Sequence, residues 1–462
     1  MQFTKVATKK IIYPLIDAIA GKSTMRYFDS YKESQWWSYQ KLMHTQDKKI
    51  RQMAKHLYSN VPYYRRIFKE KNLRPENIKN SQDLTKIPVL THENVRQHIN
   101  DLIANNMSKT SLFRCQTGGT TGHPLVLYKD KNELSSSEAC LYRGWEWSGY
   151  QIGEKRACIW GTHLATSKYA YFKEELKRIF TRSIFIGAWN LSEEKIKSSL
   201  RKMNTMKPTF LFGYTSPIYT FAKFINQEDI DLKFRLSGIL TTAEPIFDFQ
   251  RDAIEKAFNC QVFDQYGCGE VNSMGFECEE HKGLHIPTER IHIEFLDLED
   301  YSPVSDGEMG RIVVTCLENY GMPIIRYDTE DLGRKKQESC SCGRDLPLMN
   351  SIVGRTIDTI TLPNGHAIFG GFFVVALQDM EWIKKYGIIQ FQVVQKKKDY
   401  IIFKIHSQKE PSQQALESFE GLMKRHLGDV VFNVEFVDQI PVSASGKMRY
   451  IISEVNPCTS QE

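Results

Sequence analysis

Between about residue 110 and residue 355, short apolar runs alternate with helix-like segments, and this alternation limits the possible folds more than any other feature of the chain. Strands that alternate with helices predict α/β layers, in which helices cover the faces of a sheet. The runs that carry this interpretation are RACIWG at 156–161, IYTFAKFI at 218–225, DAIEKAFNC at 252–260 and QVFDQYG at 261–267.

The two ends of the chain differ from this middle part. Residues 1–110 are polar and mostly helical in pattern, with a proline in NVPYYRR that interrupts the helix pattern. The last hundred residues instead predict a small β-β-α-β unit. Its parts are IIQFQVVQ at 388–395, DYIIFKIHS at 399–407, EPSQQALESFEGLMKRHLG at 410–428 and FNVEFVDQIP at 432–441. We therefore expect a large multi-layer α/β domain over 1–355 and a small, mobile α+β domain over 356–462.

Length and composition agree with a soluble multidomain protein. A chain of 462 residues is too long for one ordinary core, and 41% hydrophobic with 25% charged residues is usual for globular proteins. A net charge of +6 gives little support for a nucleic-acid partner. The basic, apolar segment 9–22 is interrupted by Asp17, so we expect a terminal helix rather than a signal peptide.

Ten cysteines without a secretory signal favour a reducing compartment, so the cytoplasm is expected. No apolar run approaches the roughly 20 residues needed to span a bilayer, so no stable membrane insertion is expected.

Two segments suggest phosphate binding. AGKST at 20–24 resembles the end of a P-loop, but the pattern needs glycine at position 16, where the chain has Ile16, and no strand precedes it. The second segment places hydroxyls and bare backbone amides in one loop, which can form a concavity for anions. It comprises Thr117, Gly118, Gly119, Thr120, Thr121 and Gly122. From these residues alone, a polar turn between strands is the alternative.

The second loop, within TGGTTGHPL, resembles the phosphate loop of the adenylate-forming enzymes, the acyl-CoA synthetase superfamily. That family often has lysine where this chain has His123, so the chain departs from the family's pattern at the position of a positive contact. Further motifs of the family follow in the same order. The segments of this chain that resemble them are TTAEPI at 241–246, DQYGCGE at 264–270, IIRYDTEDLG at 324–333, GRTIDTI at 354–360 and IPVSASGKMRY at 440–450.

Within the superfamily, the chain is most similar to the phenylacetate–CoA ligase group, including members linked to capsular polysaccharide synthesis. The matching segments are VPYYRR, FGYTSP, ECEEHKGLHIPTE, MPIIRYDTEDLG and CSCGRDLP. The resemblance covers about residues 60 to 455 and leaves the first 60 residues without an assigned role.

The resemblance implies an ATP site. Positive charge and backbone donors must offset the repulsion when a carboxylate attacks a phosphate. The implied residues around the nucleotide are the loop 117–122 with Thr117 as a catalytic group, the adenine-lining Ala243, Glu244 and Pro245, and the strand-turn residues Asp264, Gln265, Tyr266 and Gly267. The others are the catalytic residue Glu270, which would approach Mg²⁺ and the phosphates, the ribose ligand Asp331, Arg355 for the ribose or phosphates, the hinge Asp358 and the catalytic Lys447. For the acyl substrate the resemblance implies His163 and Tyr214.

The cysteines indicate a second site. Cys340 and Cys342 form a C-x-C pair before a glycine, a common metal knuckle, and zinc prefers four thiolate or imidazole ligands. Cys278 lies in ECEEHKGLH with two histidines. The resemblance favours His285 as the fourth ligand, while His281 has the tidier C-x₂-H spacing and is its rival. Such a closed site would be structural; free thiols and surface histidines are the alternative.

The resemblance implies an ATP- and Mg²⁺-dependent ligase that activates a carboxylic acid as an acyl-adenylate and transfers the acyl group to CoA. One alternative is transfer of an acyl or aminoacyl group to an amine of a sugar or polysaccharide precursor. Another is an inactive scaffold in polysaccharide synthesis. Oligomers are possible.

Overall fold

The computed structural model describes residues 6–116, 125–161, 178–188 and 191–350, followed by 352, 354–355, 359–363, 367–369, 373, 376–377, 382–428, 430–441 and 448–455. The chain forms two compact units. The first comprises 1–329 and 333–351, and the second comprises 330–332 and 352–462. Residues 330–332 group with the second unit, although they lie before the boundary expected near 355. The hydrogen-bonded pairing of Asp331 with Arg355 and of Leu332 with Gly354 accounts for this grouping.

The first unit begins with the expected helical segment. The π-helical turn η1 leads directly into α2, and Ser38 caps α4 by accepting from the Lys41 backbone N–H. A break at Pro62 separates α4 from α5, because proline is tolerated only in the first turn of a helix. The helices are η1 (Thr8–Ile12), α2 (Tyr13–Ala20), α3 (Thr24–Ser34), α4 (Tyr39–Asn60), α5 (Pro62–Glu70) and α6 (His92–Gln97), with 3₁₀ turns at Pro75–Asn77, Gln82–Lys86 and Lys109–Ser111. Within the described residues, no helix is both long enough and apolar enough to cross a bilayer.

An eight-stranded sheet is the centre of this unit, with strand order β13-β9-β8-β7-β6-β5-β3-β4. Strands β3 to β7 are parallel to their neighbours, whereas β8, β9 and β13 are added in antiparallel fashion. The strands are β3 (Arg156–Trp160), β4 (Ser183–Gly187), β5 (Phe210–Tyr214), β6 (Gly238–Thr242), β7 (Val262–Tyr266), β8 (Gly275–Glu277), β9 (Leu284–His285) and β13 (Leu348–Met349). The α/β layering predicted from the sequence is therefore confirmed.

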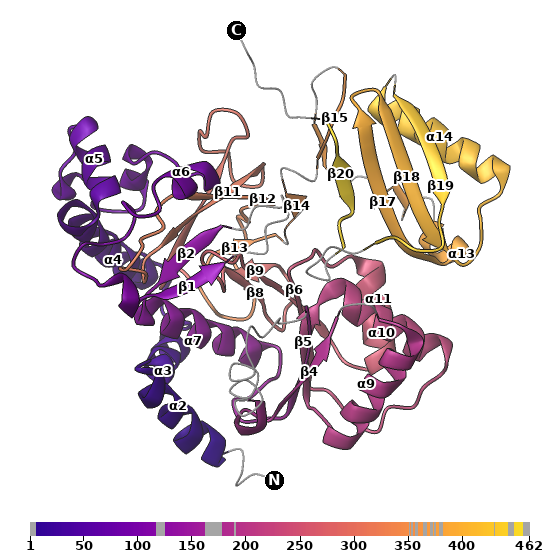
Figure 1. Cartoon of the computed structure of the whole chain (residues 1–462), viewed down its shortest axis with the longest axis horizontal. Helices are drawn as coiled ribbons and strands as arrows, with labels where there is room; N and C mark the ends of the chain where they lie inside the picture. Colours follow the sequence, from indigo (N-terminus) through magenta and orange to yellow (C-terminus); the bar gives the residue numbers. More distant parts are fainter. Residues whose placement is uncertain are drawn as a thin grey trace. The chain divides into compact units, whose positions relative to one another are not determined.

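Helices cover both faces of the sheet (Figure 1), and the strand side chains alternate between two cores. Leu211 packs with α9 (Glu193–Met206), α10 (Thr215–Gln227) and α11 (Asp248–Phe258), while Phe210 packs with α3 and α7 (Lys131–Trp147). Because each face of the sheet is covered, nearly every residue of β5, β6 and β7 is buried. Burial of one such side chain contributes about 1.5–3 kcal/mol.

A smaller sheet and a hairpin lie outside the central sheet. β10 (Ile291–Leu296), β11 (Met309–Cys316) and β12 (Tyr327–Arg334) lie side by side, and β10 and β11 are antiparallel. Residues 331 and 332 of β12 pair with β14 (Gly354–Arg355), and all four of these residues belong to the second unit. The hairpin consists of β1 (Phe113–Gln116) and β2 (Val126–Lys129).

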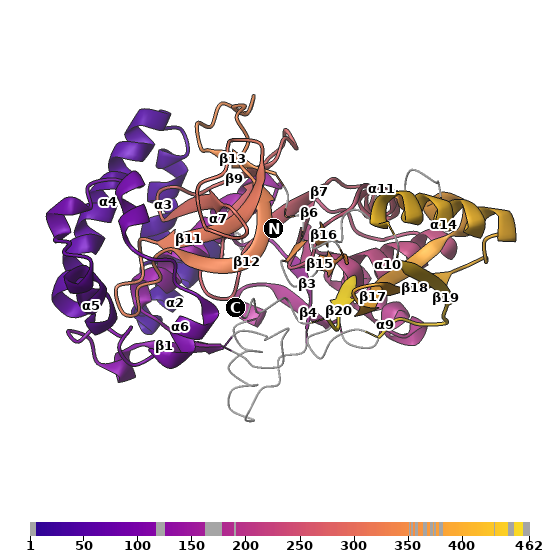
Figure 2. The same ribbon diagram turned by 90° about the horizontal axis from the view of Figure 1, so that it is seen from above.

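The second unit contains a four-stranded sheet with order β19-β18-β17-β20, and Figure 2 shows α14 lying along one face of it. Phe419 of α14 stacks on Trp382 at 4.6 Å and contacts Phe403 of β18, which fixes the helix on the sheet. The elements are β15 (Thr359–Thr361), β16 (Ala367–Phe369), α13 (Trp382–Tyr386), β17 (Ile388–Lys397), β18 (Tyr400–Ser407), α14 (Gln413–Leu427), β19 (Val431–Phe436) and β20 (Ile451–Ser453). The expected β-β-α-β order is present, and β20 extends it by pairing parallel to β17.

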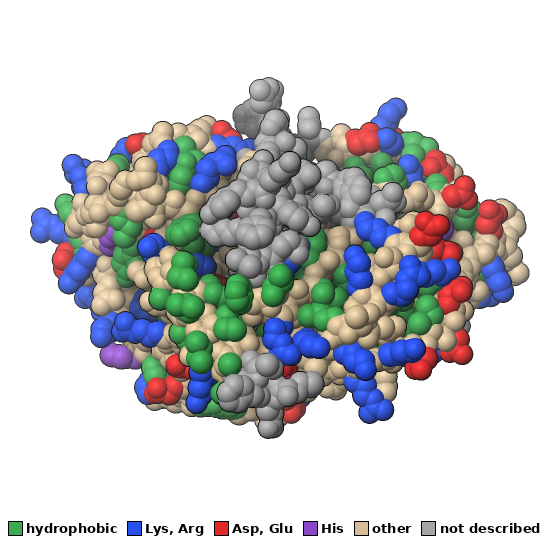
Figure 3. All heavy atoms as spheres, turned by 60° about the horizontal axis from the view of Figure 1, so that its bottom comes forward, with side chains coloured by type: hydrophobic (Ala, Val, Ile, Leu, Met, Phe, Trp, Pro, Cys, Tyr) green, Lys and Arg blue, Asp and Glu red, His purple; other side chains and the backbone are tan. Residues whose placement is uncertain are grey.

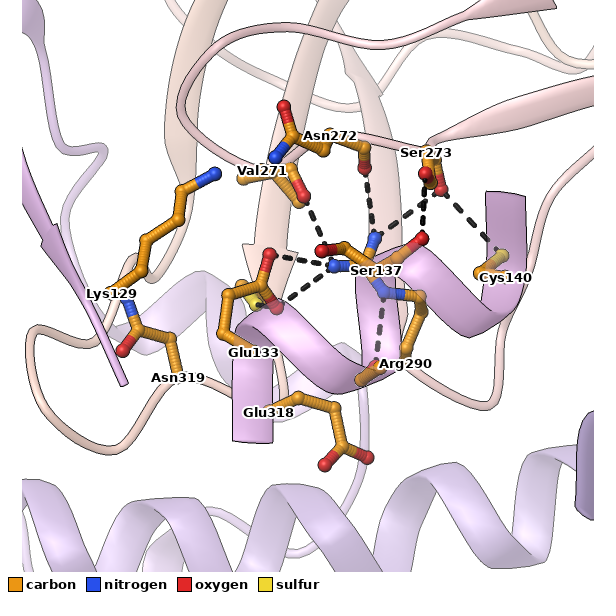
Figure 4. Close-up of polar contacts among 12 residues, drawn as sticks. Lys129, Glu133, Ser137, Cys140, Val271, Asn272, Ser273, Arg290, Glu318 and Asn319 are labelled. Atoms are coloured by element: carbon orange, nitrogen blue, oxygen red, sulfur yellow. Dashed lines mark hydrogen bonds and ion pairs between the residues drawn. The ribbon is translucent and has the colours of Figure 1, made fainter. Parts of the chain in front are cut away.

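One fully buried ion pair joins three separate elements of the first unit (Figure 4). Arg290, just before β10, binds both carboxylate oxygens of Glu133 on α7 at 2.8 Å, with side chains 0% and 1% exposed. Burial disfavours the charged guanidinium, but the Glu133 carboxylate outweighs this and raises the pKa of Arg290. Arg290 also donates to the backbone carbonyls of residues 271, 272 and 273.

We expect Arg290→Met to lower the free energy of unfolding by about 3–5 kcal/mol, because it leaves the buried Glu133 carboxylate without a partner. Urea denaturation, followed through the fluorescence of the nearby buried Trp145 and Trp147, measures this change. The matched control is Arg66→Met, since the Arg66–Asp101 pair is 45% and 48% exposed and should contribute about 0–1 kcal/mol.

Adding Glu133→Leu to Arg290→Met should recover part of the lost stability, because the unpaired charge is then removed. Equal losses in Arg290→Met and Arg66→Met would contradict this account of the pair.

Candidate functional site

The carboxyl ends of β5, β6 and β7 bring three of the sequence motifs to one edge of the sheet. β5 ends at Tyr214, β6 at Thr242 and β7 at Tyr266, and the register places Tyr214 opposite Thr242 and Thr242 opposite Gln265. In open α/β sheets, ligands bind outside the carboxyl ends of the strands. This edge is therefore the candidate active site.

The segment after β6 begins with an exposed residue in an unusual backbone conformation. Ala243 adopts a φ of 70°, a strained conformation for a residue with a Cβ, and such strain gathers at functional sites. The Glu244 carboxylate accepts from the Ser216 backbone N–H at 2.7 Å and from Ser216 Oγ at 3.0 Å, so it caps the start of α10. Glu244 also accepts through its backbone carbonyl from Thr215 Oγ1 at 3.1 Å, so the segment after β6 is joined to the start of α10.

Asp264, Gln265 and Gly267, which were predicted at the end of β7, are held in place by hydrogen bonds or by close packing. The Asp264 N–H donates to Glu277 at 2.7 Å, and the Gln265 side chain accepts from Trp145 at 3.4 Å. Gly267 has no room for a side chain, because a Cβ there would lie 2.9 Å from the Ser273 backbone nitrogen. The turn after β7 therefore requires glycine.

Tyr266 and Glu270 lie against β12. The Tyr266 hydroxyl donates to Thr329 Oγ1 at 3.4 Å, which fixes the end of the ring. Glu270 is 7% exposed, and its Oε1 accepts from the Tyr327 hydroxyl at 2.9 Å. The Tyr327 hydroxyl also lies 2.9 Å from His92 Nε2. A buried carboxylate is thus held by a tyrosine and a histidine from distant parts of the chain.

Two buried cations hold the loop that carries Glu270. Arg290 donates to the Val271, Asn272 and Ser273 carbonyls at 3.0, 2.9 and 3.2 Å (Figure 4). Lys129 is 1% exposed and donates from Nζ to the Gly269 carbonyl at 3.0 Å. With the Asn272 amide oriented to satisfy both its polar atoms, its oxygen accepts from the same Nζ at 2.8 Å.

This loop is also conformationally strained, since Asn272 and Ser273 adopt φ values of 55° and 44°. The Lys129 and Arg290 contacts therefore offset a backbone cost at the position that aims Glu270. Sequence analysis did not find Lys129, Arg290, His92 or Tyr327 as site residues. Only Tyr327 carried a signal, because it lies inside the quoted motif IIRYDTEDLG.

The remaining ATP residues of the sequence analysis fall near the unit boundary or outside the described residues. Asp331 is buried on β12, two residues after Thr329, and Arg355 is its partner on β14 in the strand register. The calls on Thr117, Gly118, Gly119, Thr120, Thr121, Gly122, His163, Asp358 and Lys447 lie outside the residues that the structure describes.

Aromatic rings gather at the neighbouring strand ends. Tyr214 at the end of β5 lies 4.2 Å from the Trp160 ring at the end of β3, and Trp160 stacks on Phe212 at 5.1 Å. Burial raises the pKa of the Tyr214 phenol, which therefore stays protonated at neutral pH. Trp160, Phe212 and Tyr214 lie together beside the candidate active site, and we call these three residues the aromatic wall.

The structure brings Cys278, His285, Cys340 and Cys342 together, with all four ligand atoms within 4.8 Å of one another. His285 Nε2 lies 3.3 Å from Cys278 Sγ and 3.4 Å from Cys342 Sγ, and the Cys278 and Cys340 sulfurs are 3.6 Å apart. Tetrahedral zinc with ordinary bond lengths requires separations of roughly 3.6 Å for S–N and 3.8 Å for S–S. The four residues therefore fit a zinc ion.

The surroundings of the cluster also suit a metal. His285 Nδ1 lies 3.3 Å from the Leu346 carbonyl, so its N–H can donate there and leave Nε2 facing the sulfurs. Burial opposes ionisation of Cys342, but hydrogen bonds from His285 and Arg344 outweigh it and lower the pKa of this thiol to about 6. The rival His281 instead lies 3.2 Å from the Glu277 carboxylate and outside the cluster.

The sequence of this chain is similar to those of known proteins. Residues 363–454 match the CapK C-terminal domain family. Protein CapK of Staphylococcus aureus is 26% identical over 466 residues, which cover 96% of this chain and 97% of that protein. The phenylacetate–coenzyme A ligase of Thermus thermophilus is 25% identical over 332 residues, covering 70% of this chain and 72% of the ligase.

Solved structures share the fold. A 2-hydroxyisobutyryl-CoA ligase in the postadenylation state, in complex with R3-HIB-AMP, superposes with a TM-score of 0.73 at 19% identity and covers 91% of each chain. ATP-bound MatB from Rhodopseudomonas palustris gives a TM-score of 0.51 at 15% identity, covering 73% of this chain and 66% of MatB. The chain is therefore homologous to Protein CapK and to the phenylacetate–coenzyme A ligases, and it has the fold of the adenylate-forming CoA ligases.

Proposed function

We propose that this protein is an ATP-dependent ligase that activates a carboxylic acid as an acyl-adenylate and then passes the acyl group to an acceptor. The observation that carries the proposal is the gathering of Tyr214, Ala243 and Tyr266 at the carboxyl ends of three neighbouring parallel strands, with Glu270 held on the next loop. Homology to phenylacetate–coenzyme A ligases supports the same reaction class.

The nucleotide would bind at this edge. The Tyr266 ring offers an apolar face to the adenine, and the backbone at Ala243 offers polar groups to its edge. Glu270 would help to hold Mg²⁺, a hard cation that prefers carboxylate and phosphate oxygens. Bound Mg²⁺ would supply positive charge that offsets the repulsion between the carboxylate and the α-phosphate.

Other residues of this chain would complete the nucleotide contacts. Asp331 would accept hydrogen bonds from the ribose hydroxyls. The motif residues Thr117–Gly122, Arg355 and Lys447 keep the roles that the resemblance implies, as proposals. Lys447 would bring a point charge to the reacting oxygens during adenylation only.

The acid would lie against the aromatic wall beside β3 and β5. Trp160, Phe212 and Tyr214 are apolar at their ring faces, and the Tyr214 hydroxyl can donate a hydrogen bond. An aromatic or otherwise apolar carboxylic acid fits this wall better than a highly charged one.

For the second step we propose CoA as the acceptor, as in the phenylacetate–coenzyme A ligases. The alternative acceptor is an amine of a sugar or polysaccharide precursor. Protein CapK matches 96% of this chain, whereas the Thermus ligase matches 70%, and residues 363–454 match the CapK C-terminal domain. The second unit would be the part that meets the acceptor.

ATP–pyrophosphate exchange with a panel of carboxylic acids tests the first step, and product analysis with and without CoA identifies the acceptor. We expect acid-dependent exchange, followed by thioester formation when CoA is added. Exchange without thioester would favour the amine acceptor. Absence of exchange with every acid of a broad panel would support the inactive scaffold instead.

We expect Asp331→Ala to raise the apparent KM for ATP, or to lower turnover, by about 5- to 150-fold, because unpaired ribose hydroxyls cost about 1–3 kcal/mol. Asp331→Asn, which keeps one acceptor oxygen, should lose less. Exchange assays at varied ATP and acid concentrations measure both effects. Asp306→Ala is the matched control, since Asp306 is 40% exposed and pairs with Lys335. A changed acid preference with normal ATP use would show that Asp331 serves the other substrate.

We also propose that Cys278, His285, Cys340 and Cys342 hold a structural zinc ion. Protein purified without chelators should contain about one zinc per chain, and His285→Ala should lose it while His281→Ala keeps it. Chelation should lower the melting temperature more than the exchange rate, because metal binding contributes to folding. Elemental analysis that finds no zinc in the unmodified protein would rule this site out.

A further inference from the structure

Large apolar side chains are exposed along one face of the N-terminal helices η1 and α2. Ile11 on η1 and Leu15 and Ile19 on α2 are 64%, 57% and 80% exposed, and Val6, which precedes η1, is 51% exposed. Ile11, Leu15 and Ile19 are four residues apart, so they lie above one another on a helix. Pro14 and Ala18 are exposed between them and add no charge. We call these residues the outer face of α2.

The opposite face of the same helix is already packed against the protein. Tyr13 is 5% exposed, and its ring meets Tyr142 of α7 edge to face at 5.5 Å. Asp17 faces inward as well, since its Oδ2 accepts from the Met25 backbone N–H at 3.0 Å. A helix that is apolar on both sides is normally buried, so the outer face is suited to contact with an apolar surface outside the protein.

Positive charge borders this face. Lys10 is exposed on η1, and the Lys9 ammonium lies over the Phe28 ring at 5.2 Å. The only acidic side chain of η1 and α2 is Asp17, which accepts from Met25. The Lys131 ammonium lies against Gly21 at the end of α2, and Arg26 is exposed at the start of α3. Beyond Arg26 the exposed charges of α3 alternate in sign, so the basic border is confined to the residues that flank α2. Figure 3 shows hydrophobic side chains gathered on this face of the molecule, with Lys and Arg beside them.

We propose that the outer face of α2 docks on an anionic lipid surface. A helix that combines an apolar face with flanking lysines lies in the plane of a bilayer interface, with its apolar side chains among the upper acyl chains and its cations near the phosphates. A second copy of this chain would be a poorer partner, because its outer face carries the same positive border, and like charges repel. The contact is peripheral and reversible, and it is independent of the proposed ligase activity.

Vesicle co-sedimentation of the full chain tests this proposal. The two probes are vesicles of phosphatidylcholine alone and of phosphatidylcholine with phosphatidylglycerol at about 7:3. We expect preferential binding to the anionic vesicles and loss of that preference at high salt, since each cation near such a surface strengthens binding about fivefold. Lys9→Glu/Lys10→Glu should weaken binding to the anionic vesicles only.

The apolar contribution is tested by Leu15→Glu/Ile19→Glu, which should lower the partition coefficient on the order of a hundredfold. Val431→Glu is the matched control, because Val431 is 63% exposed on β19, far from α2 in the sequence, and should bind as the unmodified protein does. Thermal melting checks that each variant is folded. If the double variant is not, the single change Ile19→Gln replaces it, since Ile19 is 80% exposed.

Equal binding to both vesicle types, or unchanged binding by the folded Leu15→Glu/Ile19→Glu or Ile19→Gln variant, would overturn the proposal. Light scattering without lipid provides a separate check. If the unmodified protein dimerises at micromolar concentration and the variant does not, the outer face pairs with a second copy, and the lipid proposal is wrong.

Discussion

The buried pair between Arg290 and Glu133 is the interaction on which the candidate active site depends. It joins the start of β10 to the first turn of α7, and through three carbonyls it holds the strained loop that follows β7. A buried ion pair contributes little net stability, because desolvation offsets most of the attraction. Apolar residues of the same volume would pack there, but they could not satisfy the carbonyls of Val271, Asn272 and Ser273. The main effect of the pair is therefore to position the loop that carries Glu270, and its net contribution to the free energy of unfolding is small.

The two proposed sites are attached to the same sheet. Tyr266 ends β7, and the next strands, β8 and β9, lead to Cys278 and His285. The loop with Cys340 and Cys342 then returns to β13, which pairs with β9. A zinc ion at this cluster would fasten the antiparallel end of the sheet, while Arg290 and Lys129 fasten the loop between β7 and β8. The zinc ion and the contacts of Arg290 and Lys129 would both keep the strand ends in place while substrates bind and products leave.

The sequence predicted the elements that have local patterns and missed those that depend on distant contacts. Strand-helix alternation predicted the α/β layers because each of β3, β5, β6 and β7 carries its own apolar run. In contrast, Glu133 and Arg290 are 157 residues apart, and neither differs locally from a surface residue. β20 was missed because three residues are too few for a pattern. Spacing favoured His281 as a metal ligand, yet Glu277 and Arg251 engage it, and only the fold brings His285 to the three sulfurs.

The most direct test of the central claim is a crystal structure of the protein with AMP and Mg²⁺. The account predicts the adenine ring against Tyr266 at the carboxyl ends of β6 and β7, the ribose hydroxyls at Asp331, and the metal beside Glu270. A nucleotide bound elsewhere on the chain, with this edge of the sheet empty, would contradict it.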